Sequence, residues 1–185
     1  PLRYTRRLQG ADAEGRAIED VASAQKSVVA VLIGIARERG LLHLDDPVAQ
    51  HLGSGWSSAF PSEERLITVR HLLSMNSGLA ASMNFRAEAG TEWLYNTPAY
   101  HRLMPMLEAI TGEDRNSITN EWVTRALGMS SSSWTTRGGD PRIAWGFSTT
   151  ARDLARFGLM VLAEGRWGDQ VVVGGGVPRP SAPGP

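Results

Sequence analysis

Apolar side chains recur at helical spacing after Ser23. They stand three or four positions apart, at Val28, Val31, Leu32 and Ile35. Gly40 follows as a stop signal, so the spacing predicts a helix that begins at Ser23 and ends before Gly40. The first turn of a helix leaves backbone N–H groups unpaired and carries the positive end of the helix dipole. Ser23 would therefore lie where a developing negative charge is stabilised.

A second helix signal begins at Thr97. Threonine followed by proline is typical of an N-cap and the first helical position, and apolar residues continue from there to Gly112. Pro105 lies inside this stretch and is expected to kink or split the helix. The same criteria predict further helices at residues 68–73, 117–127 and 150–162, with residues 171–173 as the best strand.

The patterning divides the chain into three segments. Residues 1–22 are polar and weakly patterned, residues 23–173 carry the helical signals, and residues 174–185 are rich in glycine and proline. We therefore expect a poorly defined lead-in, a folded domain, and a tail that does not continue the core.

Composition supports a folded domain and narrows the function. Hydrophobic residues make up 42% of the 185 residues, enough for one ordinary core. Nineteen basic and nineteen acidic side chains balance, which argues against a nucleic-acid or anionic-membrane partner. No apolar stretch has the length of a membrane span, and no secretory leader is visible in residues 1–22. The absence of cysteine excludes disulfides and thiolate metal sites but does not decide the compartment.

The chain's one lysine is a candidate catalytic base. Lys26 stands among eighteen arginines, three residues after Ser23. Arginine stays charged at physiological pH, whereas a desolvated lysine can become neutral and accept a proton. Positions i and i+3 share a helix face, so the amine can lie beside the hydroxyl, as in an activated nucleophile. The structural alternative is a solvated surface charge, which is the usual role of a helical lysine.

Several blocks in a fixed order make this signal specific. Ser23-x-x-Lys26 is followed by LDDPV at residues 44–48, ITVRHLLSMNSGL at 67–79, WLYNT at 93–97 and ARDLARFG at 151–158. Together the blocks resemble the serine hydrolases of the class C β-lactamase superfamily, which includes penicillin-binding DD-peptidases, family VIII esterases and some amide hydrolases. The resemblance covers about residues 20 to 173. It implies an α/β fold of the β-lactamase/DD-peptidase type, here mostly the helical lobe and the nucleophile helix, with much of the antiparallel sheet missing.

The resemblance also implies roles for individual residues. In this family a Tyr-x-Asn element supplies a tyrosine that exchanges protons with the nucleophile and the leaving group, and Tyr95 matches that position. The third position is Thr97, with Asn96 one place early, so either side chain is a candidate for substrate binding. Thr97 fits a capping role equally well, with Asn96 then facing the cleft. For Tyr95 the structural alternative is a half-buried tyrosine whose hydroxyl bonds a carbonyl near a turn.

The family's third element, a Lys/His-x-Gly triplet on a later strand, has no match after Tyr95. In the family that strand supplies one of two oxyanion-hole N–H groups, and loss of one such donor costs about 10²- to 10³-fold in rate.

Two hypotheses follow. In the first, the protein hydrolyses a small-molecule ester, amide or β-lactam through an acyl-enzyme at Ser23. Lys26, neutralised by burial and by Tyr95, is then the base, and Tyr95 passes the proton to the leaving group. In the second, it is a truncated, non-catalytic remnant or a ligand-binding module of the same family. Neither calls for a cofactor, and the four histidines show no metal-ligand spacing. Many relatives are exported, and the sequence fixes neither the compartment nor the oligomeric state.

Overall fold

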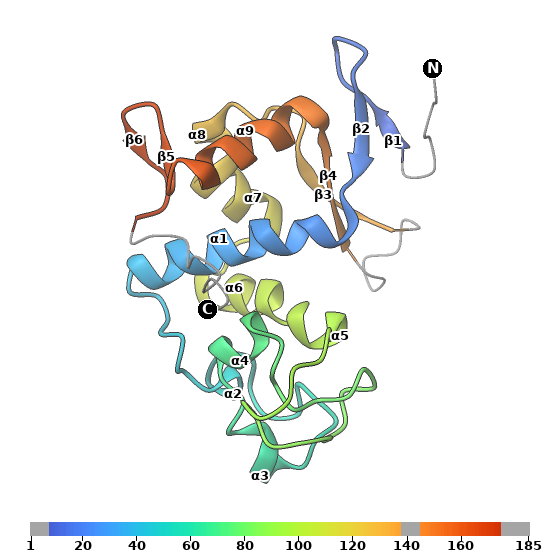
Figure 1. Cartoon of the computed structure of the whole chain (residues 1–185), viewed down its shortest axis with the longest axis vertical. Coiled ribbons are helices and arrows are strands. Elements are labelled where there is room, and N and C mark those ends of the chain that lie inside the picture. Colours follow the sequence, from blue (N-terminus) through green and yellow to red (C-terminus); the bar gives the residue numbers. More distant parts are fainter. Residues whose placement is uncertain (1–7, 138–144, 175–185) are drawn as a thin grey trace, which may run out of the picture. The chain divides into compact units, whose positions relative to one another are not determined.

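The computed structural model describes residues 8–137 and 145–174. These residues form two compact units (Figure 1). The first unit combines residues up to Glu38 with those from Asn116 onward, and the second unit runs from Arg39 to Arg115.

A four-stranded antiparallel sheet forms one part of the first unit. The strand order is β1-β2-β4-β3, and the strands are β1 (Leu8–Ala11), β2 (Ala17–Asp20), β3 (Ser133–Thr136) and β4 (Trp145–Thr150). Trp134 of β3 faces Phe147 of β4 in the register, and their rings lie 5.2 Å apart, centroid to centroid. Both side chains are buried, so this aromatic pair belongs to the core of the unit.

The hairpin of β1 and β2 lies in the segment where the sequence predicted little structure. Its turn is closed by Asp12, whose carboxylate accepts the backbone N–H groups of Glu14 (3.1 Å) and Arg16 (2.8 Å). Gly15 takes a positive φ of 75° in this turn. The side chains of β1 are exposed, so the strand has no apolar alternation that a sequence pattern could detect.

Helices form the rest of the first unit. They are the 3₁₀ turn η1 (Ala22–Ala24), α1 (Gln25–Glu38), α7 (Arg115–Thr119), the π-helical turn η2 (Asn120–Thr124), α8 (Arg125–Leu127) and α9 (Ala151–Leu162). α1 packs beside η2, and α8 packs beside α9. The predicted helix after Ser23 is confirmed and ends at Glu38, two residues before Gly40. The helix predicted at 117–127 is also present, but its centre is a π turn.

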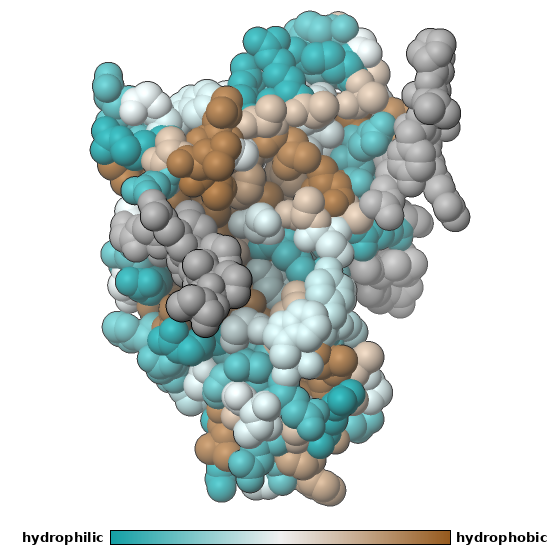
Figure 2. All heavy atoms as spheres, in the orientation of Figure 1, coloured by the Kyte–Doolittle hydropathy of each residue, from teal (hydrophilic) through white to brown (hydrophobic). Residues whose placement is uncertain are grey.

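Thr150 begins α9 as the sequence predicts. Its hydroxyl accepts the N–H of Asp153, the N-cap interaction that the Thr-x-x-Asp spacing indicates. After α9 the chain forms a small hairpin of β5 (Arg166–Trp167) and β6 (Gln170–Val171), so the predicted strand at 171–173 is shorter and begins earlier. Figure 2 shows apolar surface over α9, where Leu159 and Leu162 are exposed.

The second unit consists of short helices joined by loops. They are α2 (Val48–Leu52), α3 (Pro61–Glu64), α4 (Val69–Leu73), α5 (Thr97–Tyr100) and α6 (Leu103–Thr111). α2 packs against α6, and α4 packs against α5. Apolar side chains from these helices and their flanks are buried, among them Val48, Ile67, Val69, Leu72, Leu103, Met106 and Leu107.

Pro105 splits the helix predicted after Thr97, as expected. α5 ends at Tyr100 and α6 begins at Leu103. Proline has no N–H to donate to the carbonyl of His101, and its ring crowds that carbonyl, so a continuous helix is disfavoured between the two. α6 then ends at Thr111, and the capping residue Gly112 takes a positive φ of 73°.

Candidate active site

Ser23 lies in η1, between β2 and α1. Lys26 lies in the first turn of α1, and its Nζ is 3.4 Å from the Ser23 Oγ. The serine is exposed, whereas the lysine side chain is buried with only 9% of its surface accessible. The structure therefore brings together the hydroxyl and the amine that the sequence paired, with the hydroxyl open to solvent.

Two hydrogen bonds to Phe147 fix the ends of the serine turn to β4. The N–H of Val21 donates to the carbonyl of Phe147 (2.9 Å), and the N–H of Phe147 donates to the side-chain Oε1 of Gln25 (2.9 Å). Gln25 is buried, with 3% of its surface exposed. Its amide thus anchors the first residue of α1 to the sheet, next to the nucleophile candidate.

Ala22, directly before Ser23, has a φ of +49°. This left-handed conformation is uncommon for residues other than glycine. The Ala22 N–H donates to Oδ1 of Asp20 at 2.7 Å. Arg137 in turn donates to both oxygens of Asp20, from Nε (2.6 Å) and from Nη2 (3.0 Å), and this hydrogen-bonded pairing raises the pKa of Arg137.

Sequence reasoning missed Asp20, Gln25 and Arg137. Their partners lie more than 100 positions away in the chain, so no local pattern marks them. The nearest signal is Asp20 itself, because aspartate often accepts the N–H of the residue two positions later in a turn.

Tyr95, Asn96 and Thr97 lie in the second unit, at the start of α5. The Tyr95 side chain is 49% exposed, and its ring lies 6.5 Å from that of Trp93, centroid to centroid, with the planes tilted by 51°. Trp93 is 69% exposed. The two rings form an open aromatic pair on this loop.

Asn96, not Thr97, caps α5. Its Oδ1 accepts the N–H of Ala99 (3.1 Å), and its Nδ2 donates to the carbonyls of Leu79 (2.8 Å) and Ala80 (3.0 Å). The side chain is buried, with 2% exposed. The expectation that Thr97 caps α5 is therefore wrong, because Asn96 is the residue whose backbone is still extended and Thr97 is already helical.

Tyr100 is the last residue of α5. It is buried, with 4% exposed, and burial followed by the nearby Tyr95 phenol raises the pKa of Tyr100 well above its ordinary range. Tyr100 therefore stays a neutral phenol at any physiological pH.

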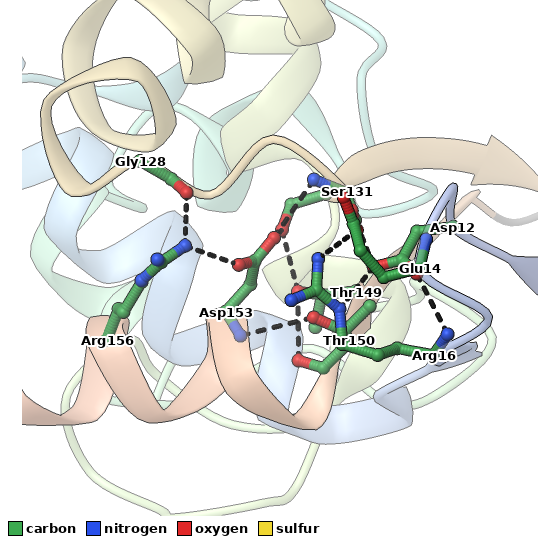
Figure 3. A network of polar contacts seen from close by, with 10 residues as sticks. Asp12, Glu14, Arg16, Gly128, Ser131, Thr149, Thr150, Asp153 and Arg156 are labelled. Atoms are coloured by element: carbon green, nitrogen blue, oxygen red, sulfur yellow. Dashed lines mark hydrogen bonds and ion pairs between the residues drawn. The ribbon is translucent and has the colours of Figure 1, made fainter.

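A second polar network ties the β1–β2 turn to the start of α9 (Figure 3). Ser131 Oγ donates to Asp12, and the Ser131 N–H donates to Asp153 at 3.0 Å. Arg16 pairs with Asp12 at 2.6 Å, and Arg156 pairs with Asp153 at 3.0 Å. Burial alone would raise the pKa of Asp12, but hydrogen bonds, chiefly from Arg16, outweigh it and lower that pKa. These carboxylates are saturated with protein donors, which indicates a structural role.

Other kinds of site have little support among the described residues. Residues 8–137 and 145–174 contain no cluster of three or more histidine, aspartate or glutamate side chains that could hold a metal ion. No helix in the same part of the chain is long and apolar enough to cross a membrane. A groove of about 530 Å³ lies in the second unit, and its lining includes Leu66, Phe85 and Glu88 but none of the predicted site residues.

Comparison with known proteins gives one family. The family model described as Beta-lactamase matches residues 4–177. Among curated proteins, the Beta-lactamase-like protein str5 of Strobilurus tenacellus is 42% identical over 65 residues, covering 32% of this chain and 23% of that protein. An uncharacterized protein of Alkalihalophilus pseudofirmus is 26% identical over 168 residues, covering 78% of this chain and 48% of that protein.

Solved structures give the same result. A candidate beta-lactamase from Bacteroides dorei has a TM-score of 0.73 and 28% identity, covering 86% of this chain and 54% of that one. A D-stereospecific amidohydrolase from a Streptomyces species has a TM-score of 0.67 and 17% identity, covering 82% and 62%. At that identity the likeness shows the fold alone. The chain spans less than two thirds of each of these relatives.

Proposed function

Because the chain belongs to the beta-lactamase family, we propose that it is a serine hydrolase that forms an acyl-enzyme on Ser23. The family model and the solved relatives carry hydrolase names, among them beta-lactamase, amidohydrolase and D-alanine carboxypeptidase. The substrate we propose is a small molecule with an ester, amide or β-lactam carbonyl.

The observation that carries this proposal is the 3.4 Å between Lys26 Nζ and Ser23 Oγ. In the proposed reaction Lys26 acts as the base and takes the hydroxyl proton while the serine oxygen attacks the carbonyl carbon. The tetrahedral intermediate then expels the alcohol or amine, which takes a proton through Tyr95. Water attacks the acyl-enzyme in the same way and releases the acid, and the proton returns to Ser23.

Tyr95 is proposed for proton transfer because its phenol is half exposed and stands at the position of the family's catalytic tyrosine. Asn96 is proposed to hold the loop that carries Tyr95, because its side chain donates to the carbonyls of Leu79 and Ala80. Thr97 then remains the candidate for substrate contact, because the cap of α5 does not require its side chain.

The test is active-site labelling. Incubation with a fluorophosphonate probe, followed by peptide mass spectrometry, is expected to give one adduct, on Ser23. Ser23→Ala should remove the adduct. Labelling at another residue, or no labelling of the wild type, would reject the assignment.

Turnover separates the two hypotheses. An activated ester such as p-nitrophenyl acetate should give a burst of p-nitrophenol equal to the protein concentration, followed by a steady rate. Neither a burst nor a steady rate would identify the non-catalytic remnant or ligand-binding module.

A further inference from the structure

Asp20 lies at the end of β2, three residues before Ser23, and takes no part in the proposed reaction. Its Oδ1 accepts the Ala22 N–H at 2.7 Å. This contact closes a turn in which the side chain of residue i accepts from the backbone of residue i+2. The turn is the one that carries Ala22 at a φ of +49°.

We propose that Asp20, clamped by Arg137 and Gly146, is a positioning residue that holds Ala22 in its left-handed conformation and so directs the Ser23 hydroxyl toward Lys26. The inference rests on the proposed function, because it assigns a role in presenting Ser23 as nucleophile.

Two neighbours, Arg137 and Gly146, fix the position of the Asp20 carboxylate. Arg137 grips both of its oxygens, at 2.6 and 3.0 Å, and planar bidentate pairing of this kind fixes orientation as well as charge. Gly146 brings the β4 backbone close to this carboxylate, since a Cβ at this position would lie 2.6 Å from Oδ2 and 2.8 Å from Cγ of Asp20. Only glycine lets the β4 backbone approach the carboxylate this closely.

This clamp matters because alanine seldom adopts a positive φ without an outside constraint. Without the Asp20 acceptor, Ala22 would relax toward negative φ. Val21 and Gln25 are held to Phe147 on either side, so relaxation of Ala22 would be taken up between them, where Ser23 lies. The contact from Lys26 to Ser23 is already long for a hydrogen bond at 3.4 Å, and a small displacement would break it.

The competing explanation is that Asp20 and Arg137 form an ordinary structural ion pair. The Asp153–Arg156 pair of the same unit provides a matched control, because its carboxylate is also buried and also accepts a backbone N–H, that of Ser131. Loss of that pair should lower stability without changing the reactivity of Ser23.

The experiment measures the second-order rate of fluorophosphonate labelling at Ser23, and the melting temperature, for wild type, Asp20→Ala, Ala22→Gly, the double variant and Arg156→Gln. We expect Asp20→Ala to slow labelling by about 100-fold, the scale of a misplaced nucleophile. Glycine adopts positive φ at no steric cost, so Ala22→Gly in the Asp20→Ala background should restore labelling to within about threefold of Ala22→Gly alone. The ion pair stays broken in that double variant. Arg156→Gln should lower the melting temperature and leave the labelling rate within about twofold of the wild type.

Gly146→Ala is an independent test, because the added methyl group displaces the Asp20 carboxylate without removing its negative charge. It should slow labelling about as much as Asp20→Ala. If Asp20→Ala does not fold, Asp20→Leu, which also lacks an acceptor but keeps the volume of the side chain, carries the same comparison with and without Ala22→Gly.

The outcomes separate the inference from the proposed function. If the wild type is labelled at Ser23 but Asp20→Ala is labelled equally fast, or Ala22→Gly gives no rescue, the positioning role is overturned and the proposed function stands. If the wild type is not labelled at Ser23, both fail.

Discussion

At the scale of single residues, the proposed chemistry depends on an amine that can release and accept a proton. Lys26 is buried beside an exposed Ser23, and its position three residues later in the chain follows from the geometry of one helical turn. Arginine would carry the same positive charge at this position but could not act as a base.

Lys26→Arg should therefore reduce fluorophosphonate labelling of Ser23 by about 10²- to 10⁴-fold, the usual contribution of a positioned base. Labelling at Ser23 is followed by mass spectrometry, with circular dichroism to verify the fold. Undiminished labelling of a folded Lys26→Arg protein would contradict the role of base. Arg39→Lys, an exposed change at the end of α1, is the matched control and should label like the wild type.

The Asn96 side chain caps α5 through its oxygen and donates to two carbonyls through its nitrogen. Substitutions can remove the second role while keeping the first. Asn96→Asp keeps an acceptor for the Ala99 N–H but places a carboxylate against the carbonyls of Leu79 and Ala80. We expect it to lower the free energy of unfolding by about 2 to 4 kcal/mol, because buried acceptors lose their donors and a charge is buried.

Thr97→Ser is the comparison for Asn96, and we expect it to change the free energy of unfolding by less than about 0.5 kcal/mol. Both values are measured by urea denaturation. Equal effects of the two substitutions would show that the Asn96 contacts do not stabilise the loop. The choice of cap was readable in the sequence, since asparagine ranks above threonine at N-caps.

At the scale of elements, α4 begins with a capping box that contains a histidine. The Thr68 hydroxyl accepts the His71 N–H, and the Thr68 N–H donates to Nδ1 of His71 at 3.2 Å. Protonated imidazole cannot accept that bond. Burial, and then the charge of Arg70, lower the pKa of His71.

Protonation of His71 makes the stability of the folded protein depend on pH. In the unfolded chain His71 takes up a proton near its ordinary pKa of 6.5, while the folded protein resists protonation. The free energy of unfolding should therefore fall as the pH falls from about 7 to 5. Glutamine completes a capping box without titrating, so the melting temperature of His71→Gln should fall less than that of the wild type over this range. Parallel pH curves for the two proteins would refute the assignment.

Elements with local signals were predictable and elements made by long-range pairing were not. α1, α4 and α9 each have a cap or stop residue and an apolar face within one stretch of chain, so their positions could be predicted. β1 has four residues, all of them exposed, and β2 pairs with β4 across about 130 positions. The sheet beneath Ser23 therefore left no pattern in the sequence.

At the scale of the whole molecule, the family and the mixed α/β fold that the sequence predicted are confirmed by the family match and by the solved relatives. The ordered blocks made this possible, because each lies where local signals are strong. The paired residues around Ser23 depend instead on contacts between segments far apart in sequence.

Each unit contains a carboxyl group whose pKa is lowered, and such groups make the stability depend on acid. In the second unit, burial of Glu64 opposes its ionisation, but hydrogen bonds from Ser57 and Gly55 outweigh burial and lower the pKa of this carboxyl. In the first unit, hydrogen bonds likewise lower the pKa of the Asp12 carboxyl. A depressed carboxyl pKa adds stability above the unfolded value, and that stability is lost as the pH falls further.

We therefore expect the midpoint of urea unfolding to fall as the pH drops from about 5 to 3. Glu64→Gln should lower the free energy of unfolding at pH 7 by about 1 to 3 kcal/mol, because an amide replaces an acceptor that receives three donors. The same variant should lose less stability than the wild type on acidification. Glu63→Gln, a neighbour without these contacts to residues 55–57, is the control, and equal losses for Glu64→Gln and Glu63→Gln would contradict the prediction.

The π-helical turn between α7 and α8 predicts where the length of the sequence can vary among homologues. A π turn is an α-helix with one residue inserted, and the neighbouring turns keep their faces because the extra residue bulges locally. Buried side chains here fall four and five positions apart, with Trp122 and Val123 both buried after Ile118. Evolution can add or remove one codon at Asn120–Thr124 without rotating either flank, so alignments of homologues should show single-residue gaps at this point.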